Sequence, residues 1–153
     1  MKFTNNSTSI MKWDSFGNGS REFRHHAITI DSKDNVYVDY EDNEDIQKFT
    51  NNGTFIDSWG YQGKQNPQYG FNEHHGLAVD SKDNVYLIDT QNHSVQKSDS
   101  DGNYISSWGK LGVKEGEFLL VSDIYIDSND FIYVSDSRAV HPNEIQFQSF
   151  LLA

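Results

Sequence analysis

The sequence has 153 residues, enough for one domain that buries about 70% of the surface of its unfolded chain. Its 23 acidic and 12 basic side chains give a net charge of −11, which opposes binding to nucleic acid and to anionic membrane surfaces. Cysteine is absent, so disulfides, thiolate metal sites and cysteine nucleophiles are excluded. No stretch is apolar enough for a secretory signal or a membrane span, so we expect a soluble chain of unknown compartment.

Hydrophobic residues make up 35% of the chain and aromatic residues 14%, a balance that favours many short, half-buried strands. The first predicted strand, at residues 8–15, contains Ile10 and Trp13. Trp59 follows Trp13 after 46 residues and Trp108 follows Trp59 after 49, which indicates an internal repeat. Three copies of one unit are predicted, at residues 23–60, 71–109 and 118–150.

Each predicted unit begins with two strands joined by a tight turn. The matching segments are ITIDSKDNVYV from Ile28, LAVDSKDNVYL from Leu77 and IYIDSNDFIYV from Ile124. Apolar residues alternate along the first strand of each segment, as in a strand with one buried face. The turn residues tolerate a left-handed backbone, and they are Asp34-Asn35, Asp83-Asn84 and Asn129-Asp130.

Two further strands complete the unit. In the first copy the third strand is predicted at residues 46–49, a turn follows at Asn52-Gly53, and the fourth strand ends at Trp59. The second copy repeats this plan with a turn at Asp101-Gly102. The third copy stops after its third strand, so it lacks a fourth strand of its own.

Three segments of the chain resemble NHL repeats: HGLAVDSKDNVYLIDTQNHSVQK from His75, SDGNYISSWG from Ser100 and WGKLGVKEGEF from Trp108. The resemblance implies an all-β, NHL-type β-propeller, in which four-stranded blades surround a central channel. Because that family is usually six-bladed, three blades per chain would make half of a ring. The chain departs from the pattern at Tyr40, where the later copies have aspartate, and at extra residues 139–142.

Several recurring residues are interpreted as structural. Asp31, Asp80 and Asp127 stand at the hairpin turns, where a carboxylate commonly binds nearby backbone amides, so a cation site is not needed to explain them. Asp89 and Asp136 match the aspartate that closes the loop after the second strand in the family that the chain resembles. The recurring tryptophans are expected to pack between neighbouring blades.

Two pairs of histidines are the candidate ligand-binding residues. His25-His26 and His74-His75 precede the innermost strand of successive copies, so we expect them at one mouth of the channel. Here the sequence is also similar to the propeller of the peptidylglycine amidating lyase, which implies zinc bound at His26 and His75. Neutral imidazole suits zinc, which can activate water or polarise a carbonyl. The third copy has Ser122 at this position.

Two hypotheses for function follow. The first is a non-catalytic binding or scaffold module, without a cofactor, that presents its loops to a protein, a peptide or a small molecule. The second is a zinc-dependent lyase or hydrolase that uses the histidines at the channel mouth. Nucleic acid is not expected as a partner, because the few basic residues are scattered along the chain.

The number of strands leads to a prediction about assembly. Three blades are too few to close a ring, and an open ring exposes a blade face and a strand edge. We therefore expect a homodimer of six blades. In it, the strand with Ile10 and Trp13 is predicted to pair beside Ile145 to Phe147 of the other copy.

Overall fold

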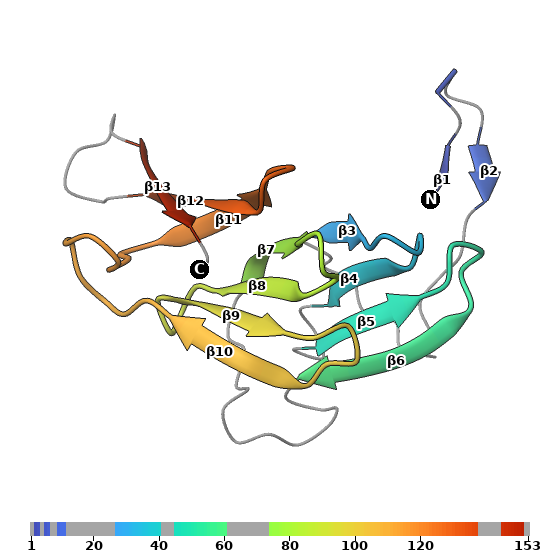
Figure 1. The fold of residues 1–153 in the computed structure, drawn as a ribbon, viewed down its shortest axis with the longest axis horizontal. Coiled ribbons are helices and arrows are strands. Elements are labelled where there is room, and N and C mark those ends of the chain that lie inside the picture. Colours follow the sequence, from blue (N-terminus) through green and yellow to red (C-terminus); the bar gives the residue numbers. More distant parts are fainter. Residues whose placement is uncertain are drawn as a thin grey trace, which may run out of the picture.

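The structure, a computed structural model, describes residues 2–3, 5–6, 9–11, 27–40, 45–60, 74–137 and 145–151 (Figure 1). The regular elements in these ranges are all β-strands, which confirms the predicted all-β class. They form three antiparallel sheets and one two-stranded hairpin. Within the same ranges, no helix is long and apolar enough to cross a membrane.

Sheets one and two have the same plan, in which four strands pair in the order of the sequence. Sheet one consists of β3 (Ile28–Ile30), β4 (Val36–Tyr40), β5 (Asp45–Phe49) and β6 (Phe55–Gly60). Sheet two consists of β7 (His74–Val79), β8 (Val85–Asp89), β9 (Ser94–Ser98) and β10 (Tyr104–Trp108). The strands predicted for the first two copies are therefore present.

Sheet three has three strands among the described residues, β11 (Val121–Ile126), β12 (Phe131–Ser137) and β13 (Ile145–Leu151). The hairpin consists of β1 (Lys2–Phe3) and β2 (Ser9–Met11). The strand predicted at residues 8–15 is thus described only over β2, and Trp13 lies outside the described residues. Its exchange into a second copy stays a prediction.

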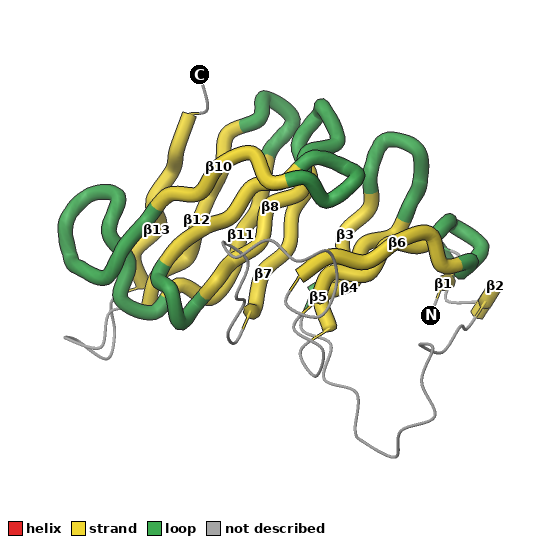
Figure 2. The backbone as a smooth tube through the Cα atoms, turned by 90° about the horizontal axis from the view of Figure 1, so that it is seen from below, coloured by secondary structure: helices red, strands yellow, loops and turns green. Residues whose placement is uncertain are grey.

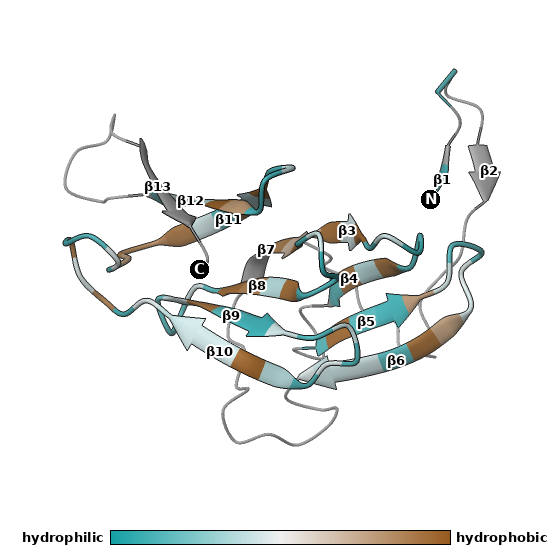
Figure 3. Ribbon diagram, in the orientation of Figure 1, coloured by the Kyte–Doolittle hydropathy of each residue, from teal (hydrophilic) through white to brown (hydrophobic). Residues whose placement is uncertain are grey.

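The three sheets follow one another along a curve, with their first strands on the inner side. Figure 1 shows β3, β7 and β11 on the concave side and β6 and β10 on the convex side. The central strand β7 contacts both β3 and β11. Strands make up most of the described chain, and loops lie at their ends (Figure 2). The turns between the first and second strands are hydrophilic, whereas hydrophobic residues lie on the strands and in the connection from β10 to β11 (Figure 3).

Two hydrophobic cores join the sheets in sequence. Between sheets one and two, the buried residues are Tyr37, Ile46 and Trp59 from the first sheet and Leu77, Val85 and Leu87 from the second. Between sheets two and three, they include Tyr86, Ile88 and Val95 from the second sheet and Ile124, Ile132 and Val134 from the third. Sheet two therefore buries both of its faces, because alternate residues of a strand point to opposite sides.

The repeated aspartates organise the turns after the first strands, as predicted. Asp80 accepts hydrogen bonds from the backbone N–H groups of Lys82 and Asn84, both at 2.9 Å, and from the Tyr86 hydroxyl at 2.9 Å. Asp31 makes the equivalent bonds in sheet one and Asp127 in sheet three. Each turn places one aspartate in the left-handed region, and these residues are Asp34, Asp83 and Asp130.

The tryptophan at the end of the fourth strand packs between sheets, as predicted. Trp59 is 1% exposed and contacts the Tyr37 ring edge to face, with ring centroids 5.9 Å apart. Gly102, in the turn of the next sheet, lies against the Trp59 indole: a Cβ at this glycine would come within 2.6 Å of the ring. Its φ of 78° also favours glycine. Trp108 repeats the contact on Tyr86 at 6.0 Å.

The two predicted loop-closing aspartates behave differently. Asp89 is fully buried and accepts hydrogen bonds from Asn92 and Gln96, which follow β8, so the prediction is confirmed. Asp136 is equally buried, but it accepts from the backbone N–H groups of Leu119 and Leu120, which precede β11. Its carboxylate thus fixes the entry into the first strand of sheet three.

Candidate functional site

The candidate site is a groove of about 600 Å³ on the concave side of the molecule. The first strands of all three sheets line it, through residues 27–29, 77–79 and 122–126. The groove therefore lies where a propeller has its central channel, and it is assembled from segments far apart in the sequence.

One glycine sets the width of the groove between sheets two and three. A Cβ at Gly76 would lie 3.0 Å from the Ile124 nitrogen and 3.1 Å from the Asp123 Cα. Both contacts are tighter than most real Cβ contacts, so a side chain here would push the backbones of β7 and β11 slightly apart. The same position is held by Ala27 in sheet one and by Asp123 in sheet three.

The groove combines apolar walls with a few polar groups, as many ligand sites do. Ile28 is 64% exposed and Tyr125 is 67% exposed, so both present apolar surface to the groove. Asp123 is an exposed carboxylate, and the Ser122 hydroxyl lies 3.0 Å from the Ser135 hydroxyl. Neither lysine nor arginine is among the described lining residues. This surface favours a neutral or cationic ligand with an apolar body.

Of the predicted histidines, the structure places only the second pair. His74 and His75 are the first residues of β7, and His74 is in register with Asp89 of β8. His25 and His26 lie outside the described residues, so their predicted position at the channel mouth stays a prediction. Among the residues that are described, no three histidines or carboxylates come together in a way that could hold a metal ion.

In the third copy, the residue at the repeat position of His75 is part of the groove. Ser122 holds in β11 the position that His75 holds in β7, and Ser122 lines the groove.

The exposed Ile28 and Tyr125 and the carboxylate of Asp123 were missed from the sequence. The signal that could have found the carboxylate is the replacement of a small residue, at Ala27 and Gly76, by a charged one at Asp123.

A model of the NHL repeat matches residues 71–97, which span β7, β8 and most of β9. No match was found among curated proteins. Several solved structures share the fold. A catalytically inactive virginiamycin B lyase from Staphylococcus aureus, solved with quinupristin, is 15% identical with a TM-score of 0.60, and the match covers 97% of this chain and 47% of that one.

Two further solved structures are similar. A protein from Lactobacillus plantarum is 12% identical over 97% of this chain and 49% of its own, with a TM-score of 0.55. A putative exported protein from Bacteroides fragilis is 13% identical over 88% of this chain and 36% of its own, with a TM-score of 0.60. This chain thus spans at most about half the length of these structures.

These identities are low, so the solved structures bear on the fold alone. The repeat match is consistent with the fold. The matched residues form β7, β8 and most of β9 of sheet two, and sheets one and three pack against this sheet. The chain carries an NHL repeat at residues 71–97 and has the fold of NHL-type β-propeller proteins.

Proposed function

We propose that the protein is a non-catalytic binding module that holds a peptide, a protein segment or a small molecule in the groove lined by β3, β7 and β11. The observation that supports this proposal is the groove itself, which is lined by the exposed Ile28 and Tyr125 and by the Asp123 carboxylate. Nucleic acid and anionic membranes are left out of the proposed partners because the chain carries a net charge of −11.

The chemistry of the walls restricts the ligand. Apolar surface from two sheets can cover an aliphatic or aromatic group, while Asp123 and Ser122 accept or donate hydrogen bonds at the side. An anionic ligand would face an unfavourable carboxylate with no cation among the described lining residues. A peptide with a basic residue next to an apolar one is the simplest ligand of this kind.

The test is a selection of displayed random peptides on the wild-type protein, followed by binding measurements on variants. Peptides that bind the groove should lose affinity by at least about tenfold for Thr29→Arg and for Ser122→Arg, because each arginine fills the groove and repels a basic ligand. The matched control is Ser106→Arg on the exposed strand β10, which should leave affinity unchanged. Peptides that bind both groove variants as well as the wild type would contradict the proposal.

A zinc-dependent lyase or hydrolase is the second candidate, favoured by the position of Ser122. Because Ser122 lines the groove and shares its strand position with His75, a metal held by His26 and His75 would adjoin the same groove. Neutral imidazoles fit zinc, and a catalytic site normally adds a third protein ligand.

Zinc should raise the melting temperature if this second candidate is right. At a hundredfold excess over the dissociation constant, linkage contributes about 2.7 kcal/mol, which is roughly 5–10 °C for a chain of this size. The double variant His26→Ala, His75→Ala should lose the rise. Calcium, which prefers oxygen ligands, is the control metal. Melting that is unchanged by zinc, with no metal found by elemental analysis, would rule out the enzyme.

A further inference from the structure

Both junctions between sheets are built from the same two faces. We call tyrosine face the side of a sheet that carries Tyr37 in sheet one, Tyr86 in sheet two and Tyr133 in sheet three. We call aliphatic face the opposite side, which carries Ile28 and Ile30 in sheet one. The equivalent residues are Leu77 and Val79 in sheet two and Ile124 and Ile126 in sheet three.

At each junction a tyrosine face meets the aliphatic face of the next sheet. Tyr37 packs with Leu77 in the core between sheets one and two, and Tyr86 packs with Ile124 in the core between sheets two and three. The chain therefore uses one kind of interface twice, always in the same direction.

One face of each kind is only partly covered within the described chain. On the aliphatic face of sheet one, Val36 and Phe49, which are in register with Ile30, are buried. On sheet one, Ile28 and Ile30 are 64% and 60% exposed, whereas Leu77 at the equivalent position is 6% exposed. On sheet three, Tyr133 is 38% exposed, whereas Tyr86 is fully buried. The exposed parts of these two faces are complementary, because they correspond to the two halves of the interface that the chain already forms internally.

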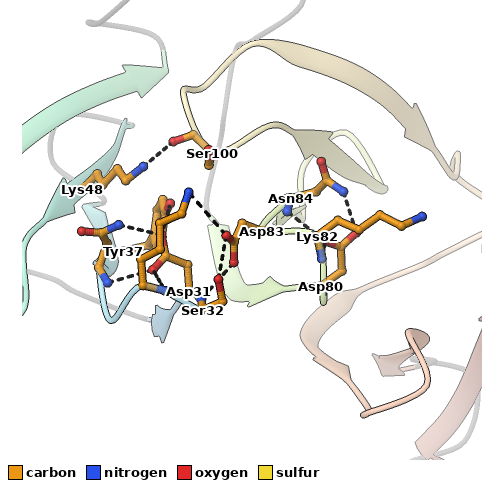
Figure 4. Close-up of polar contacts among 11 residues, drawn as sticks. Asp31, Ser32, Tyr37, Lys48, Asp80, Lys82, Asp83, Asn84 and Ser100 are labelled. Atoms are coloured by element: carbon orange, nitrogen blue, oxygen red, sulfur yellow. Dashed lines mark hydrogen bonds and ion pairs between the residues drawn. The ribbon is translucent and has the colours of Figure 1, made fainter.

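A polar link accompanies each internal junction. Ser32 of sheet one donates its backbone N–H to the Asp83 carboxylate at 2.8 Å and its hydroxyl at 2.9 Å (Figure 4). Ser81 of sheet two donates the same two bonds to Asp130, at 2.8 and 2.6 Å. Each accepting aspartate is in the left-handed region, which an aspartate side chain tolerates better than most.

The last sheet carries a serine, and the first sheet an aspartate, at the repeat positions that form this serine–aspartate link. Ser128 holds in sheet three the position of Ser32 and Ser81, and Asp34 holds in sheet one the position of Asp83 and Asp130. Asp34 has the same backbone conformation as its two counterparts, with a φ of 62°. No side-chain hydrogen bond joins Ser128 or Asp34 to the rest of the described chain.

We propose that the tyrosine face of sheet three binds the aliphatic face of sheet one of a second copy, and that Ser128 of one copy donates to Asp34 of the other. Two such junctions close a dimer, since each copy offers one face of each kind. Ile28 belongs both to this interface and to the wall of the groove, and Tyr125 lies on the tyrosine face beside Tyr133. The tests below measure mass without any ligand, so the dimer can fail while the groove still binds a ligand.

The first test uses variants that block one face each. Wild-type protein should have twice the 17.6 kDa mass of the chain in light scattering. Ile30→Asp, on the aliphatic face, and Tyr133→Lys, on the tyrosine face, should each be monomeric. A mixture of the two should recover a dimer, because one native junction and one junction of opposite charges can form. The control is Ile105→Asp, an isoleucine 48% exposed on the outer strand β10, which should stay dimeric.

The second test concerns the polar link. Asp34→Gly removes the carboxylate and suits the left-handed backbone, so it should weaken the dimer by about tenfold, as should Ser128→Ala. The double variant should be no weaker than either single one, because both substitutions remove the same bond. Circular dichroism verifies that each variant is folded.

Three results would overturn the proposal: a folded wild-type monomer at all concentrations, a mass that keeps growing with concentration, or blocked variants that fail to associate when mixed. Monomeric wild type would leave the two faces to be covered by sheets of another chain. Additive effects of Asp34→Gly and Ser128→Ala would refute the predicted hydrogen bond.

Discussion

Trp59→Ala is expected to lower the free energy of unfolding by about 3–5 kcal/mol, the usual cost of removing a large buried aromatic side chain. The side chain is 1% exposed and contacts both the Tyr37 ring and the backbone of Gly102. Its indole nitrogen has no hydrogen-bond partner among the described residues, so the loss is one of packing. The cavity would open at the junction of sheets one and two.

Urea unfolding followed by circular dichroism measures this effect, and Trp108→Ala is the matched control. Trp108 ends the fourth strand of sheet two at the equivalent position, but it is only partly buried. Its removal should therefore cost less than that of Trp59. Equal losses of unfolding free energy for the two variants would mean that the deeper burial of Trp59 does not explain its contribution to stability.

The repeat made the strands predictable from sequence. Alternating residues and left-handed turn residues recur three times, and the described sheets follow that plan. The starts of β7 and β11 were less clear, because both strands begin three residues earlier than the alternation indicates. A register shift lies between His74 and Leu77 and another between Val121 and Asp123. Such a bulge breaks the period of two from which a strand is recognised.

Exposure could not be predicted in the same way. Ile28 and Leu77 hold one position of the repeat, yet Ile28 is 64% exposed and Leu77 is 6% exposed. A sequence pattern says which residues share a face, but it does not say whether another sheet covers that face. For the same reason the groove, whose wall includes Ile28, was not predicted, whereas the tryptophan packing between sheets was.

The histidine prediction remains open for a different reason. The prediction rested on the sequence position of His26 and His75, just before the alternating residues of the first strand. That position does not determine the direction in which the imidazole rings point. The structure gives the strand position of His75 and does not describe His26. The loop aspartates show how much such a detail matters. Asp89 and Asp136 hold the same position in the repeat. The Asp89 carboxylate accepts a hydrogen bond from Asn92, which follows the second strand of its sheet, whereas the Asp136 carboxylate accepts one from Leu120, which precedes the first strand.

Asp80→Ala is expected to have the second large effect, a loss of about 3–5 kcal/mol, as for breaking a buried charged pair. The substitution removes the acceptor of the Tyr86 hydroxyl, which is fully buried, and of the Asn84 side chain at 2.8 Å. It also removes the carboxylate 3.5 Å from the Lys97 ammonium group. The matched control is Asp127→Ala, measured with its own reference in the monomeric Ile30→Asp background. There the exposed Tyr133 hydroxyl stays free to bind water, so the substitution should cost less.

The same carboxylate makes stability depend on pH. Burial opposes the ionisation of Asp80, but hydrogen bonds from Asn84, Tyr86 and Lys82 outweigh it and hold its pKa below the ordinary 3.8. A group whose pKa is lower in the folded state stabilises the fold above its unfolded pKa, and this contribution is lost as the pH falls through the folded pKa. Wild-type stability should therefore fall below about pH 4, and Asp80→Ala should lose less between pH 7 and pH 3. Urea unfolding at these two pH values measures both slopes, and parallel losses would show that Asp80 is not the residue responsible.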